Sequence, residues 1–170
     1  MEDKMLQLEK GDFKIRQLKE NEAPLYKTMR LEAIKTEPAM FRVSKPPEAE
    51  LTDIEWEQRI KNPRLVYGLF KNNQPIGMTS MLLLNPEEAY LGQSYIKKEF
   101  RGQGLSSLLY QIRMQSAYQL GLKRLSVSHR KSNLASKAAN QRMGFIFTHN
   151  ESMSWLDGTT EDVLYYVLDL

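Results

Sequence analysis

Two glycines, Gly102 and Gly104, stand between a strand-like stretch, residues 90–96, and a helix-like stretch, residues 105–120. A glycine-bearing loop that leads into a helix directs several backbone N–H groups at one point, where the helix dipole is also positive. The sequence therefore predicts a binding site for a phosphate or a pyrophosphate. A pair of glycines taken alone more often makes only a tight turn, so the surroundings of the loop decide between the two.

The distribution of charge favours an anionic ligand at this loop. The chain has 170 residues and a net charge of +3. Residues 97–144 contain ten Lys or Arg and one acid, so this segment carries +9 and the remainder carries −6. A segment this basic is typical of proteins that bind a nucleic acid or a phosphate-bearing cofactor. Stacking on bases needs more aromatic side chains than Phe100, Tyr110 and Tyr118, so we expect no nucleic-acid partner.

The composition limits the class of protein. The length predicts a single domain over residues 1–170, and 41% hydrophobic residues fit a soluble globular protein. No apolar run is long enough to cross a membrane. The absence of cysteine excludes disulfides and a thiol nucleophile, and it makes a cytoplasmic location the default expectation. His129 and His149 have no partner thiols, so we expect no metal site.

The elements that position the loop follow an α/β order. Strand patterns cover residues 13–18, 65–70, 76–84, 89–96, 124–128, 145–147 and 163–168. Helix patterns cover residues 24–37, 51–60, 105–120 and 134–143. The order β-α-α-β-β-β-α-β-α-β-β predicts a mixed, mostly antiparallel sheet of six to seven strands. Its centre is one βαβ crossover, residues 89–128.

Two common phosphate loops do not fit the residues. The P-loop of ATPases needs Lys and then Ser or Thr directly after the second glycine, but Leu105 and Ser106 stand there. The dinucleotide fingerprint needs a third glycine where Ser107 stands, and an acid about twenty residues further on. Residues 121–131 contain no acid. ATP and dinucleotides are therefore poor candidates for the ligand.

The chain instead resembles the GNAT acetyltransferase superfamily over most of its length. The run Arg101-Gly102-Gln103-Gly104-Leu105-Ser106 matches the pyrophosphate loop of that family except for Ser in the last place. Asn133-Leu134-Ala135-Ser136 resembles the start of the family's Asn-bearing helix, and Met143-Gly144-Phe145 resembles its closing Gly-Phe. The resemblance implies a GNAT fold.

The same resemblance implies acetyl-coenzyme A as the donor, with no metal. Its pyrophosphate would lie on the loop N–H groups, and its pantetheine arm would lie where the fourth and fifth strands separate, hydrogen-bonded by Asn133. The residues expected to bind it are Ile96, Arg101, Gly102, Gln103, Gly104, Leu105, Ser106, Ser107, Asn133 and Ser136. Asn133 can equally serve as a plain helix N-cap.

The expected reaction is the transfer of acetyl to an amine by direct attack, with backbone N–H groups near residues 95–97 stabilising the oxyanion. In many family members a Tyr on the Asn133 helix protonates the departing thiolate, but here Asn140 occupies that position. The catalytic candidates are Asn140, Tyr95 and His129. Tyr95 can also be a plain strand aromatic, and His129 a plain surface histidine. The loss of the Tyr motivates an alternative, a non-catalytic acyl-coenzyme A sensor on the same fold.

The acidic part of the chain indicates which class of amine acceptor the protein uses. Regions outside residues 97–144 carry the −6, and they offer carboxylates that can attract a cation: Glu32, Glu37, Glu87, Glu88, Glu151 and Asp157. We therefore expect a small-molecule amine or polyamine, or a protein N-terminus or lysine. The sequence is compatible with a monomer or a homodimer.

Overall fold

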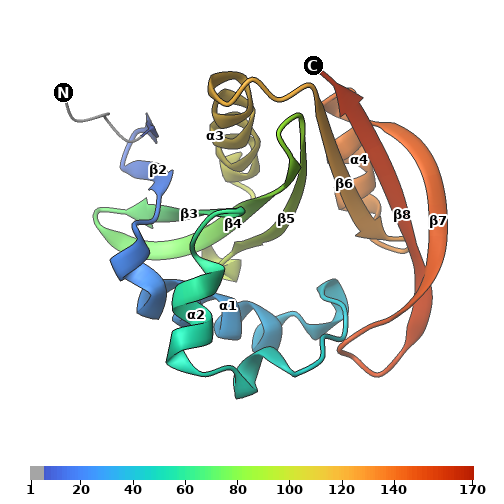
Figure 1. The fold of residues 1–170 in the computed structure, drawn as a ribbon, viewed down its shortest axis with the longest axis horizontal. Helices are drawn as coiled ribbons and strands as arrows, with labels where there is room; N and C mark the ends of the chain where they lie inside the picture. Colours follow the sequence, from blue (N-terminus) through green and yellow to red (C-terminus); the bar gives the residue numbers. More distant parts are fainter. Residues whose placement is uncertain (1–5) are drawn as a thin grey trace.

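One eight-stranded sheet organises the computed structural model, which describes residues 6–170. The strands are β1 (Gln7–Lys10), β2 (Phe13–Gln17), β3 (Arg64–Lys71), β4 (Gln74–Asn85), β5 (Glu88–Ile96), β6 (Arg124–Arg130), β7 (Ile146–Ser154) and β8 (Thr160–Asp169). Their order across the sheet is β1-β2-β3-β4-β5-β6-β8-β7. Every neighbouring pair is antiparallel except β5 and β6 (Figure 1). The expected mixed, mostly antiparallel α/β fold with a central βαβ unit is confirmed.

Four helices cover the two faces of the sheet. α1 (Ala23–Thr36) and α2 (Asp53–Arg59) pack on one face, and α3 (Leu105–Gln119) and α4 (Leu134–Arg142) lie on the other side (Figure 1). Each face has its own apolar core, one centred on Tyr26 and Trp56 and the other on Leu108 and Ile112. No helix within residues 6–170 is long and apolar enough to cross a membrane.

The strand count exceeds the expected six to seven because β1 was not predicted. This edge strand pairs with β2, and Gly11 makes the turn between them with a φ of +57°. Its sequence, QLEK, is polar and mostly exposed, so only Leu8 contributes apolar character. An edge strand has one partner and one solvated side, which leaves little hydrophobic alternation to detect.

The parallel pair β5 and β6 separates soon after it starts. Glu88, Ala89 and Tyr90 pair with Arg124, Leu125 and Ser126, and no later residue of either strand is paired with the other. Gln93 adopts a φ of +56°, next to a register shift between β4 and β5. Such a bulge bends a strand away from its neighbour. The two strands therefore splay apart at the carboxyl end of β5, which leads into the glycine loop.

Candidate active site

The glycine loop has the backbone of an anion cradle. Gly102 and Gly104 have φ values of +79° and +74°, a conformation that side-chain-bearing residues rarely adopt. Gly104 is the N-cap of α3, and no side chain caps this helix. The first N–H groups of a fifteen-residue helix are therefore left for solvent or a ligand. The loop residues 101–104 are exposed.

Not every loop group that was expected to bind a ligand is available. The Arg101 guanidinium donates to the Ile96 carbonyl at 2.9 Å and forms an ion pair with Glu37 at 2.8 Å. The Arg101 side chain therefore ties the loop to β5 and α1. The Ser107 N–H donates to the Gly104 carbonyl at 3.3 Å, so the open donors belong to residues 103–106.

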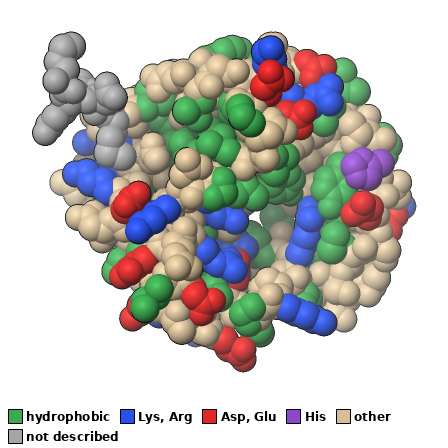
Figure 2. Space-filling model, viewed as in Figure 1, with side chains coloured by type: hydrophobic (Ala, Val, Ile, Leu, Met, Phe, Trp, Pro, Cys, Tyr) green, Lys and Arg blue, Asp and Glu red, His purple; other side chains and the backbone are tan. Residues whose placement is uncertain are grey.

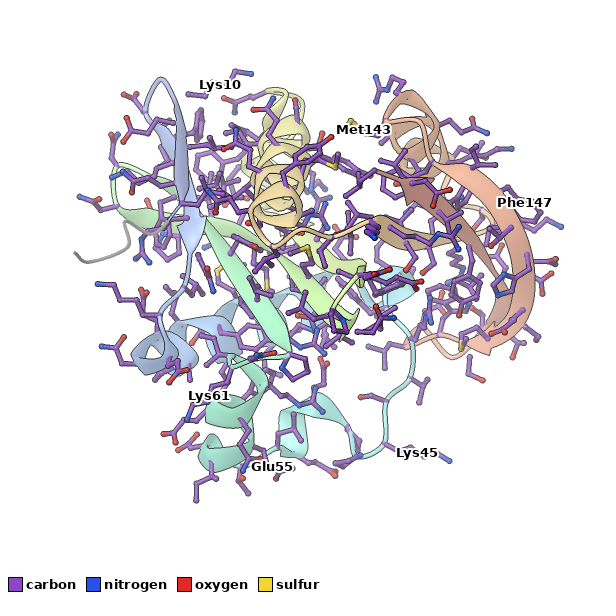
Figure 3. All side chains as sticks on the ribbon, turned by 45° about the horizontal axis from the view of Figure 1, so that its top comes forward. Lys10, Lys45, Glu55, Lys61, Met143 and Phe147 are labelled. Atoms are coloured by element: carbon purple, nitrogen blue, oxygen red, sulfur yellow. The ribbon has the colours of Figure 1, made fainter. Side chains whose placement is uncertain are left out.

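Lys10 adds a cation to this loop that the sequence did not indicate. A Cβ placed on Gly104 would lie 3.1 Å from Lys10 Nζ. Lys10 ends β1, and Figure 3 shows its side chain beside one end of α3. In the described part of the chain, no carboxylate forms an ion pair with it. The hairpin of β1 and β2 thus brings a positive charge to the glycine loop.

A cavity of about 380 Å³ lies where β5 and β6 splay apart. Its lining includes Tyr110 from α3 and Asn140 from α4 on one side, and Arg30 from α1 on the other. The cavity therefore reaches between both faces of the sheet. Figure 2 shows a hollow near the centre of the molecule with Lys and Arg side chains on both sides.

Tyr110 and Asn140 form a pair in the cavity wall. The Tyr110 hydroxyl donates to Asn140 Oδ1 at 2.5 Å, and Asn140 is buried. Burial raises the pKa of the Tyr110 phenol, although Arg113 and Arg142 act in the opposite direction. Tyr110 was not predicted as a site residue, because its link to Asn140 joins two helices thirty residues apart. The one feature of the sequence that could have indicated Tyr110 is its place in the helix that starts directly after the glycine loop.

His129 lines the same cavity, but both of its ring nitrogens are engaged within the protein. Nδ1 lies 2.6 Å from the Arg130 carbonyl, which only accepts, so Nδ1 carries the proton. Nε2 then accepts from the Tyr166 hydroxyl at 2.9 Å. His129 is only 5% exposed, so the alternative of a plain surface histidine does not hold. Its hydrogen bonds favour a role in holding β6 and β8 together.

Tyr95 is not brought to the cavity. It is buried in the core that α1 and α2 form with the sheet, and its hydroxyl accepts from Thr36 Oγ1 at 3.3 Å. Leu91 packs in the α3 core, and regular alternation along β5 would turn Tyr95 to that same face. The bulge at Gln93 changes the alternation, so Tyr95 packs in the core on the α1 face. Tyr95 is therefore too far from the cavity lining to take part in the proposed chemistry.

Asn133 and Ser136 line the cavity at the start of α4. Asn133 Oδ1 accepts from the Ser136 N–H at 3.1 Å, so Asn133 is the helix N-cap. Its Nδ2 points to Met40 Sδ at 3.4 Å, a weak acceptor that a stronger one can replace. Ile96 lies at the end of β5, outside the lining.

Residues 95–97, whose backbone N–H groups were expected to stabilise the oxyanion, do not line the cavity. The Lys97 N–H donates to the Ile76 carbonyl at 2.8 Å, so it is already satisfied. The part of β5 that lines the cavity runs from Tyr90, the last residue paired with β6, through Leu91, Gly92 and Gln93 to Ser94. An oxyanion in the cavity would therefore meet residues 91–94 first.

The expected acidic surroundings of an acceptor are not found at the cavity. Among residues 6–170, Glu48 is the single acid in its lining, against five arginines: Arg30, Arg42, Arg64, Arg113 and Arg130. The acids expected to attract a cation are largely paired, for example Glu32 with Lys97 at 3.5 Å and Glu37 with Arg101. Desolvation lowers the pKa of the fully buried Arg113 to about 10. The cavity is cationic.

The strand pair that splays over a cavity and the glycine loop that starts a helix form the arrangement expected from the resemblance to GNAT acetyltransferases. Residues 29–145 match the family model described as "Acetyltransferase (GNAT) family", so the chain belongs to the GNAT acetyltransferases. A search of curated proteins found no match.

Solved structures with the same fold cover nearly the whole chain. The ribosomal L7/L12 α-N-protein acetyltransferase RimL, in complex with coenzyme A, is 20% identical with a TM-score of 0.75, covering 95% of this chain and 96% of that one. The ribosomal-protein-S5-alanine acetyltransferase from Vibrio fischeri is 15% identical with a TM-score of 0.76, covering 96% of both chains. The microcin C7 self-immunity acetyltransferase MccE, in complex with acetyl-CoA and AMP, is 16% identical with a TM-score of 0.72, covering 95% and 94%. These likenesses show the fold.

Proposed function

We propose that this chain is an N-acetyltransferase that transfers acetyl from acetyl-coenzyme A to a primary amine by direct attack. The observation that carries the proposal is the cavity at the splay of β5 and β6, with the Tyr110–Asn140 pair in its wall. The glycine loop follows the end of β5, the strand that borders this cavity. Donor binding and chemistry are therefore next to each other along one strand.

The residues present fit the donor. The open N–H groups of residues 103–106, with Lys10 beside them, suit a pyrophosphate. The Asn133 amide suits a polar group of the pantetheine arm, because its Nδ2 has only a sulfur as its partner. When bound, the thioester supplies an activated acyl carbon and a thiol leaving group.

Tyr110 is our candidate for the proton donor. Since burial raises its pKa above the ordinary value of 10.0, the phenol stays protonated at neutral pH. The amine nitrogen bonds to the acyl carbon, and the carbon–sulfur bond breaks with its electron pair going to sulfur. Tyr110 gives its hydroxyl proton to that sulfur, and the proton that the nitrogen loses restores the phenol through solvent.

Asn140 positions this proton donor. In the structure its Oδ1 accepts the Tyr110 hydroxyl proton at 2.5 Å. A half-turn of the Asn140 amide would present its NH₂ group to the phenol oxygen instead, which frees the O–H and stabilises the phenolate after transfer. The amine must also lose a proton, and the positive charge of the lining arginines favours its neutral form.

The test combines two measurements on one preparation. Calorimetry measures acetyl-coenzyme A binding, and a thiol reagent measures coenzyme A released on addition of small amines, polyamines, lysine or peptides with free N-termini. Amine-dependent thiol release is the expected result. Binding without release would favour the acyl-coenzyme A sensor, and absence of binding would contradict both.

A further inference from the structure

We propose that the amine acceptor carries an oxyanion, a carboxylate or a phosphate, which Arg42 binds together with Arg30 and Arg64. The inference rests on the proposed function and names the substrate class for the same cavity. It departs from the expectation that carboxylates around the site attract a cationic acceptor. Its basis is the balance of charge in the part of the cavity that adjoins α1.

Arg42 is a guanidinium held without an anion. It donates to the Tyr165 hydroxyl at 3.1 Å, the Tyr90 hydroxyl at 3.3 Å and Ser128 Oγ at 2.5 Å. Within residues 6–170, no carboxylate lies in ion-pair range of it. Hydroxyls fix the direction of the group while leaving its charge uncompensated, which suits binding of an incoming oxyanion.

The backbone around Arg42 is also fixed. Arg42 forms an antiparallel bridge with Trp155, and the Val43 N–H donates to the Ser154 carbonyl at 3.0 Å. The Leu156 N–H donates to the Phe41 carbonyl at 3.0 Å. This short ladder joins the segment after α1 to the turn between β7 and β8. Arg42 is therefore held ready before any ligand binds.

Arg30 supplies an unused donor in the same lining. Its Nε and Nη2 donate to Glu48 at 2.8 and 3.4 Å, but Nη1 is buried and has no partner among the described residues. The residue is only 8% exposed. A buried guanidinium N–H without an acceptor is costly, and a ligand oxyanion would satisfy it once neighbouring side chains move to expose Nη1.

Arg64 adds a third charge, and Arg130 does not. No hydrogen bond or ion pair in the described part of the chain engages the Arg64 side chain, which lines the cavity. Arg130 is neutralised by Asp157 at 2.8 Å and by Glu161. Glu48 pairs with Arg30, so within residues 6–170 the lining arginines without a carboxylate partner are Arg42, Arg64 and, from α3, Arg113.

The position of Arg42 suits an anion close to the reacting amine. Its partners Tyr90 and Ser128 belong to β5 and β6 at the point where their pairing stops. Tyr110 and Asn140 line the same cavity from α3 and α4. An acceptor held by Arg42 would thus place its amine towards the splay, with the proton donor on the far side.

The experiment compares amines in matched pairs that differ only in the anion. β-Alanine is set against propylamine, and O-phosphoethanolamine against ethanolamine, with thiol release from acetyl-coenzyme A as the readout. We expect kcat/KM to be at least about tenfold higher for an anionic member. The pair that shows the preference distinguishes a carboxylate from a phosphate.

Variants assign the preference to the arginines. Arg42→Gln and, as a milder change, Arg64→Gln should lower kcat/KM for the anionic member by roughly 10- to 100-fold more than for the neutral member. Arg124→Gln is the matched control, since Arg124 pairs with Asp169 outside the cavity and should change neither. Thermal unfolding of each variant identifies a loss of fold.

The outcomes separate this inference from the proposed function. Equal or better use of the neutral amines, or a preference that survives both substitutions, overturns the inference while acetyl transfer stands. Acetyl-coenzyme A binding with no turnover of either anionic amine also overturns it. Failure to bind acetyl-coenzyme A overturns the proposed function first.

Discussion

The Tyr110 hydroxyl lies 2.5 Å from Asn140 Oδ1, so a phenol stands beside the residue that replaces the Tyr expected on α4. The two side chains come from different helices and meet in the cavity wall. An amide cannot donate a proton at neutral pH, but it can orient a group that does. The substitution at Asn140 is therefore compatible with catalysis when Tyr110 is considered with it.

Tyr110→Phe tests this pairing. We expect kcat to fall by roughly 10- to 100-fold, towards the low end of what a positioned acid contributes, because a thiolate is already a fair leaving group. The affinity for acetyl-coenzyme A should be unchanged. Because burial raises the pKa of Tyr110, kcat of the wild type should show no decrease up to about pH 9 from loss of this proton.

Tyr118→Phe is the matched control, since Tyr118 lies on the same helix and is 65% exposed. It should retain full kcat. Wild-type kcat in the Tyr110→Phe variant would exclude Tyr110 as the proton donor.

Glu48 carries the only carboxylate in the described cavity lining, and its loss should destabilise the fold. Glu48→Ala leaves the Arg30 guanidinium buried without its counter-charge, so we expect the free energy of unfolding to fall by about 3–5 kcal/mol. Urea denaturation measures this. Glu20→Ala, which removes an exposed pair with Lys61, should cost less than about 1 kcal/mol. Equal effects would mean that the Arg30–Glu48 pair is not important for stability.

At the scale of elements, the hairpin of β1 and β2 forms the edge of the sheet and also brings a cation to the glycine loop. Lys10 at the end of β1 places its ammonium beside Gly104. Lys10 and Gly104 are far apart along the chain, so the sequence alone does not predict this contact. β1 itself could not be predicted, because an exposed edge strand with one apolar side chain lacks a period.

Lys10→Gln should weaken acetyl-coenzyme A binding by about fivefold, the size of one exposed charge contact. The loss should shrink at high salt, because screening weakens the contact in the wild type. Calorimetry at two salt concentrations measures both effects. Lys14→Gln on β2 is the control, since Lys14 pairs with Glu9 at 3.8 Å and should bind as the wild type does. An unchanged affinity for Lys10→Gln would remove Lys10 from the donor site.

The elements around the loop were predicted more fully than the site. Buried stripes and the glycines at 102, 104, 121 and 144 gave α3 and α4 to within a residue at each end. Asn133 was expected as a helix cap, and its bond to the Ser136 N–H confirms this. These features depend on residues a few positions apart. The Tyr110–Asn140 pair and the engaged ring of His129 depend on contacts between elements, which local patterns do not contain.

At the scale of the whole molecule, the distribution of charge in the folded structure differs from its distribution along the sequence. Residues 97–144 carry +9, yet Arg101, Arg124 and Arg130 are each paired with acids from other segments. Among the residues that the structure describes, the arginines without a carboxylate partner include Arg42 and Arg64, from the part of the sequence that is acidic overall. The expectation of a cationic acceptor rested on sums along the chain, which leave out the ion pairs that these acids form across the fold.

The fold as a whole links donor and acceptor through the splay of β5 and β6. The glycine loop leaves one end of β5, and the cavity borders its unpaired stretch. Donor binding at the loop is therefore the claim on which the reaction, Tyr110 and the acceptor site all depend.

The most direct test of that claim is the affinity for acetyl-coenzyme A of Gly104→Glu compared with Gly121→Glu. Both glycines flank α3 with similar φ values, +74° and +70°, so both substitutions carry the same backbone strain of about 1–2 kcal/mol. Only the first places a carboxylate at the loop. We predict that calorimetry will show a loss of roughly 100-fold or more for Gly104→Glu and wild-type affinity for Gly121→Glu. Equal affinities in a folded Gly104→Glu variant and the wild type would contradict the assignment of the loop as the donor site.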